Sequence, residues 1–201
     1  MGVTPRLDFR RLLSDQALAS QEGLEAVESF LRRPSPEALE RVRASAAAAA
    51  KKASAVLEAL DQRPPAAGPA RRRIFTLVRA LEAMVEAAKS AAEETLRFAV
   101  SAEGPLQDMA RGARQAAEDL AKALECLERK DPAKASDHVV QAKRGENWVE
   151  HVRRGASAEK ARNAGPVTAL ALQSIFGRFS AAALHGDEAA DIIGELVVEP
   201  L

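Results

Sequence analysis

The last long segment of the chain, residues 174–198, reads SIFGRFSAAALHGDEAADIIGELVV. Its apolar residues recur every three or four positions, which predicts a helix with one buried face. Asp187, Asp191 and Glu195 follow one another at intervals of four residues and form an acidic stripe on that helix. Because like charges one turn apart repel each other by about 0.2–0.5 kcal/mol, the stripe requires a counter-charge, a metal ion or open water.

Proline and glycine divide the whole chain into six predicted helices. Ser35 is the expected N-cap of the second helix, with Pro36 at its first position. The polar stretch 155–166 is expected to be a loop, and Gly186 is expected inside the last helix at a cost of about 1 kcal/mol. The predicted helices span roughly residues 14–33, 36–63, 71–100, 106–129, 134–154 and 167–198.

The composition favours a compact helical bundle. Lysine plus arginine and aspartate plus glutamate number 29 each, aromatic residues make up 3%, and tyrosine is absent. This balance disfavours a nucleic-acid-binding protein, because neither a strong positive field nor stacking platforms are available. We therefore expect one all-α domain over residues 1–201, a six-helix bundle of two three-helix repeats at about 14–101 and 105–198. Ile74-Phe75 recurs as Ile175-Phe176, and this offset of 101 places Glu86 over Asp187.

No pattern typical of catalysis or secretion is found in the sequence. Cys126 is the only cysteine, which excludes an internal disulfide. No nucleophile with a neighbouring base, phosphate-binding loop or zinc spacing occurs, so we expect a protein that is not an enzyme. The start, Met1 to Arg6, lacks the apolar stretch of a signal peptide, and no uninterrupted apolar run reaches about 18 residues. The expected location is the cytoplasm.

The segment from Ser174 to Val198 resembles the C-terminal helix of the PhoU-like proteins, in the branch that accompanies Pit-type inorganic phosphate transporters. Residues 146–153 and 71–86 resemble the fifth and third helices of that family. The resemblance implies two three-helix repeats whose acidic residues, four apart on several helices, hold divalent or iron ions. The acidic residues that match the family pattern are Glu82, Glu86, Asp187, Glu188 and Asp191.

Several positions depart from the family pattern and weaken the metal prediction. Lys143 and Asn147 stand where the fifth helix would carry an acidic pair, and residues 46–50 are all alanine where the second would carry one. Arg72 and Arg73 replace two acidic residues, and Leu184 replaces another. Solvated helix faces are the alternative interpretation of all the acidic pairs.

The sequence thus favours a non-catalytic accessory or regulatory protein of phosphate transport that contacts a Pit-type permease, at the inner face of the membrane. Arg71, Arg72 and Arg73 are the candidate partner-binding residues, with a solvated basic cluster as the alternative. Two other functions stay open: an alanine-rich, phasin-like coat of lipid or polymer granules, and a helical bundle that binds metal through carboxylates. A homodimer is compatible with each of these three functions.

Overall fold

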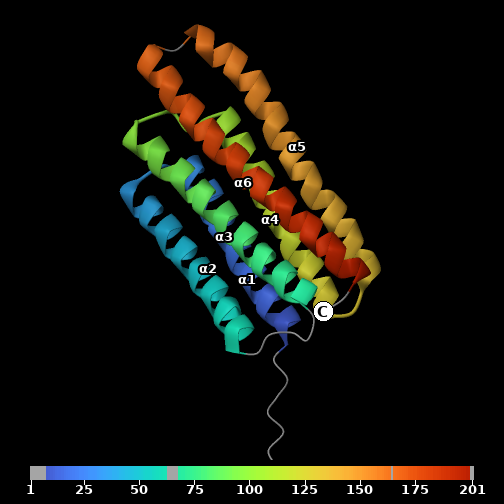
Figure 1. Ribbon diagram of the computed structural model, residues 1–201. Coiled ribbons are helices and arrows are strands. Elements are labelled where there is room, and N and C mark those ends of the chain that lie inside the picture. Colours follow the sequence, from blue (N-terminus) through green and yellow to red (C-terminus); the bar gives the residue numbers. More distant parts are fainter. Residues whose placement is uncertain (1–7, 63–67, 164, 200–201) are drawn as a thin grey trace, which may run out of the picture.

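The computed structural model describes residues 8–62, 68–163 and 165–199, with the backbone alone for residues 157–163. These residues form six long α-helices, and no strand occurs among them, which confirms the all-α six-helix prediction (Figure 1). The helices are α1 (Phe9–Arg32), α2 (Pro36–Gln62), α3 (Gly68–Arg97), α4 (Pro105–Glu128), α5 (Pro132–Asn163) and α6 (Pro166–Val198).

The helices pack in two sets of three. Within the first set α1, α2 and α3 all contact one another, and α4, α5 and α6 repeat the same pairings in the second. Two further pairs, α1 with α4 and α3 with α6, join the sets along their length. Figure 1 shows the resulting bundle, with α2 and α5 on opposite outer sides. The acidic stripe of α6 therefore lies on a helix that α3, α4 and α5 surround.

The core lies between the helices and is built largely from leucine and alanine. Leu13, Ile74, Leu120 and Phe179 are 0% exposed, and Phe30 is 1% exposed. Each such side chain stabilises the fold by roughly 1.5–3 kcal/mol relative to an exposed one. The apolar face predicted for residues 174–198 is thus turned into the core.

The start of α2 agrees with the sequence prediction, whereas the start of α1 does not. The Ser35 hydroxyl accepts a hydrogen bond of 3.1 Å from the backbone N–H of Ala38, and Pro36 is the first helical residue. α1 begins at Phe9, five residues before the predicted Ser14, because the Asp8 carboxylate accepts from the N–H of Arg10 at 3.1 Å and caps the helix.

The predicted loop at 155–166 was wrong over residues 155–163, because α5 continues through Gly155 to Asn163; residue 164 lies outside the described residues, and Gly165 is the N-cap of α6. Gly155 is exposed and nothing lies within 4 Å of the position its Cβ would take. One exposed glycine costs a helix only about 1 kcal/mol, and the alanine-, lysine-, glutamate- and arginine-containing stretch that follows consists largely of good helix formers.

Three other glycines allow helices to approach closely. A Cβ on Gly186 would lie 3.3 Å from the Met84 methyl carbon, so this glycine is a packing residue between α6 and α3. A Cβ on Gly112 would lie 2.7 Å from the Trp148 ring, and one on Gly145 would lie 2.7 Å from the Ala116 Cβ. The α4–α5 pair is therefore held at a separation that larger residues would prevent.

Candidate functional site

The acidic stripe of α6 meets a lysine from α5. The Lys143 Nζ lies 3.5 Å from the Asp187 Oδ1 and donates a hydrogen bond to the Asp191 Oδ1. The hydrogen bond to Asp191 raises the pKa of Lys143; burial opposes this change, and the charge of Asp187 adds to it. One ammonium thus serves both aspartates, and the sequence requirement for a counter-charge is met from within the chain.

The other two acidic residues of this segment point elsewhere. The Glu188 Oε2 lies 2.9 Å from the Nδ1 of His185, one turn earlier on the same helix. Glu195 is exposed, and among the described residues its carboxylate makes no ion pair. Of the three acidic residues that match the family pattern in α6, the structure therefore brings together Asp187 and Asp191 around Lys143 and leaves Glu188 apart.

On α3, Glu82 and Glu86 each pair within their own helix. The Glu82 Oε2 lies 2.5 Å from Arg79, and the Glu86 Oε2 lies 2.7 Å from Lys89. Both glutamates border a hollow of about 350 Å³ against Ala46, Ala49 and Ala50 of α2. The alanine run therefore faces these glutamates, and it offers them no side-chain ligand.

The carboxylates proposed from the sequence do not converge on a common point. Within residues 8–62, 68–163 and 165–199, no group of three or more histidine, cysteine, aspartate or glutamate side chains is placed to hold a metal ion. Oxygen-ligated cations such as calcium normally take six to eight ligands. The paired aspartates of α6 with a lysine between them are a poor start for such a shell.

The three consecutive arginines at the start of α3 have different surroundings. Arg71 lies 3.6 Å from Asp61 of α2, and Arg73 lies 2.7 Å from Glu199 after α6. Arg72 is exposed and makes no ion pair among the described residues. It lines a hollow of about 420 Å³ together with Phe75, whose side chain is half exposed.

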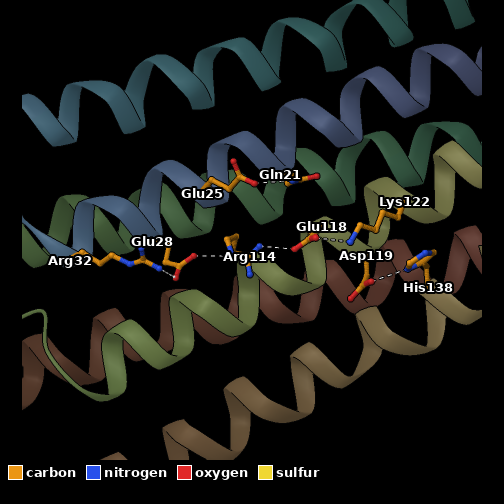
Figure 2. A network of polar contacts seen from close by, with 9 residues as sticks. All are labelled: Gln21, Glu25, Glu28, Arg32, Arg114, Glu118, Asp119, Lys122 and His138. Carbon is orange, nitrogen blue, oxygen red and sulfur yellow. Dashed lines mark hydrogen bonds and ion pairs between the residues drawn. The ribbon is translucent and has the colours of Figure 1, made fainter.

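A charged network between α1 and α4 was not predicted from the sequence (Figure 2). Glu28, which is 8% exposed, pairs with Arg32 at 2.6 Å and with Arg114 at 2.8 Å. Arg114 continues to Glu118 at 2.7 Å, and Glu118 to Lys122 at 2.6 Å. The spacing of residues 114, 118 and 122 is visible in the sequence, whereas the link across to α1 depends on tertiary packing.

The protonation of this network follows from its pairing. Burial works against the charge of Arg114, but Glu118 and Glu28 outweigh it and raise the pKa of the guanidinium. Hydrogen bonds from Lys122 and from Arg114 lower the pKa of Glu118. Pairing thus favours the charged forms of Arg114 and Glu118, and the ion pair between Arg114 and Glu28 joins the two three-helix sets.

A second buried carboxylate joins α3 to α6. Glu94 is 9% exposed; its Oε1 accepts from the Arg178 Nε at 2.9 Å and its Oε2 accepts from the Ser174 hydroxyl at 2.7 Å. Both interfaces between the sets therefore contain a paired buried acid. The Glu28 and Glu94 carboxylates both have hydrogen-bonding or ion-pair partners within the bundle, which favours a structural role for them.

Comparison with known proteins adds no assignment. No protein-family model matches the chain, and no curated protein matches it. By length and composition α6 is the one helix of the described residues that could cross a membrane. In the bundle it packs against α3, α4 and α5.

Proposed function

We propose that this protein is a PhoU-like accessory or regulator of inorganic phosphate transport, which acts by contact with a Pit-type permease and uses no metal ion to do so. The observation that carries the proposal is the position of Lys143. The segment on which the resemblance rests faces α5, and the residue it meets there is the one that replaces a family acid.

Position 143 decides the chemistry of this surface. An acidic residue there would place three carboxylates together, a group suited to a hard divalent cation. Lysine supplies a fixed positive charge in the same place and leaves the cluster with a formal charge of −1. The bundle then has a permanent ion pair between α5 and α6 where a family member would need an ion.

We place the contact with the permease at the N-terminal end of α3, where Arg72 and Phe75 are exposed. Arg72 and the half-exposed Phe75 lie side by side along a hollow whose other lining includes Leu57 and Leu60 of α2. Arginine and aromatic residues beside an apolar hollow are typical of residues that contribute most to a protein interface. The expected partner is a cytoplasmic segment of the permease that carries an acidic residue and an apolar anchor.

Affinity purification from cells tests the proposal. The tagged protein should recover a phosphate permease, and Arg72→Glu combined with Phe75→Ser should abolish the recovery. Arg97→Glu, an exposed arginine on the same helix, is the matched control and should leave it unchanged. The proposal fails if no permease is recovered and deletion of the gene leaves phosphate uptake as before.

The two alternatives predict different results. A granule coat would have to expose the apolar faces of α1 to α4, which are turned into the bundle core; it would be recovered by flotation with granules. A metal protein would contain stoichiometric metal after purification without chelator, and Asp187→Ala with Asp191→Ala would remove it.

A further inference from the structure

A third hollow lies at the end of the bundle where α1 begins and where α4 and α6 end. It has a volume of about 400 Å³, within the range of small-molecule sites in proteins. Leu13 of α1, Leu124 of α4 and Leu196 of α6 form its floor and are at most 2% exposed. Leu127 and Val197 extend this apolar surface toward solvent.

The polar lining of this hollow is positively charged. Arg10 and Lys130 are its charged lining residues, and no carboxylate belongs to the described lining. Two acidic side chains that flank Lys130 in the sequence are already paired: Asp131 with Lys134 at 3.0 Å and Glu125 with Arg129 at 2.5 Å. Lys130 itself is exposed and makes no ion pair within the described part of the chain.

The backbone fixes the place of Lys130. Its φ of 62° is left-handed, and the N–H of the following Asp131 bonds to the Cys126 carbonyl at 2.8 Å, which closes α4. The lysine therefore begins at a defined point beside the apolar floor, and its flexible stem lets the ammonium reach a bound head group.

We propose that this hollow binds an amphipathic anion: a single unbranched alkyl chain with a carboxylate or phosphate at one end. The chain would lie on Leu13, Leu124 and Leu196, and the anionic head would meet Lys130. An uncharged alkyl chain would use only the floor, and an alkyl cation would be repelled. This site is independent of the proposed contact with a permease.

Isothermal titration calorimetry of the full chain tests the proposal with four ten-carbon ligands, the ionic ones below their micelle concentrations, and with shorter carboxylates. Decanoate and decyl phosphate should bind with one-to-one stoichiometry, and their relative affinity identifies the preferred head group. Decanol should bind up to about fivefold more weakly, and decyltrimethylammonium more weakly still. From hexanoate to decanoate each added CH₂ should tighten binding by up to about fourfold.

Two variants make the test specific. Lys130→Glu should lower the affinity for decanoate at least fivefold and raise the affinity for decyltrimethylammonium. Lys51→Glu on α2 should change neither affinity. Leu127→Trp should fill the hollow and lower the affinity for all four ten-carbon ligands, and circular dichroism verifies that the variant is folded. Equal binding of decanol and decanoate, an unchanged affinity in Lys130→Glu, or unsaturable uptake of many chains per protein would overturn the proposal. So would a dimer whose formation decanoate does not affect and which covers the hollow.

Discussion

Replacing Lys143 tests how the acidic stripe of α6 is neutralised. In Lys143→Met the side chain keeps its length and loses its charge, so Asp187 and Asp191 face each other without a counter-charge. The lysine side chain is 38% exposed, and the two aspartate side chains are 28% and 62% exposed. Solvent therefore screens both pairs, and each is worth about 0.2–1 kcal/mol rather than the value of a buried pair.

The expected loss of stability follows from these terms. Two screened pairs and the renewed repulsion between the aspartates, about 0.2–0.5 kcal/mol, together give a loss of about 1 kcal/mol for Lys143→Met. In a chain of this size that lowers Tm by roughly 2–4 °C. Lys143→Glu adds a third carboxylate, and we expect about twice the loss. Asp191→Asn in the Lys143→Met background should recover part of it.

Thermal unfolding followed by circular dichroism measures the effect, at low and at high salt. The pKa of Lys143 is raised in the folded state. Its contribution is therefore complete below the unfolded lysine pKa of about 10.4 and is lost as the pH rises through the higher folded pKa. The difference between wild type and Lys143→Met should shrink above that range. A Met variant as stable as wild type at pH 7 and low salt would refute the reasoning, and Lys51→Met on α2 is the matched control.

Three further predictions concern the packing, the backbone and the charges of the bundle. Gly145→Ala should destabilise the protein by about 1–3 kcal/mol in chemical unfolding, because its Cβ would meet a methyl group of α4 at 2.7 Å. Gly155 on the same helix has open space around it, so Gly155→Ala should stabilise the protein by about 0.5–1 kcal/mol. Equal effects of the two substitutions on the free energy of unfolding would contradict this account. Ala99→Gly should raise stability by about 1 kcal/mol, since φ is 48° at this residue; a lower Tm would show that the left-handed turn is not strained. The hydrogen bond from Lys122 is the main cause that lowers the pKa of Glu118. The Glu118 carboxylate therefore contributes stability above its unfolded pKa of about 4.3, and this contribution is lost as the pH falls through the folded pKa. In Glu118→Gln the free energy of unfolding should depend less steeply on pH in that window, and an unchanged pH profile would argue against the network.

Local signals in the sequence were enough to predict the helices and most of their ends. Ser35 and Pro36 act within one turn, so the start of α2 could be placed from the sequence alone. Gly155 was misleading because a single glycine is a weak stop signal when strong helix formers follow it. The cap at Asp8 has only a weak sequence signal, because it precedes an apolar period that becomes clear only at Leu12 and Leu13.

The candidate site depended on contacts that the sequence does not encode locally. The need for a counter-charge at Asp187 and Asp191 could be read from their spacing, but Lys143 lies more than 40 positions away and meets them only because α5 packs against α6. The pairing of Glu28 with Arg114 likewise depends on the interface between the two sets of helices. Spacing within one helix indicates what a charge requires, and tertiary packing determines which residue supplies it.

Calorimetric titration of Mn²⁺ into the wild type and Lys143→Glu tests most directly whether lysine takes the place of a metal ion. We expect no stoichiometric binding by the wild type, and one site in Lys143→Glu whose occupation reverses the loss of Tm. A wild-type protein that binds one Mn²⁺, and loses it in Asp187→Asn, would contradict the account.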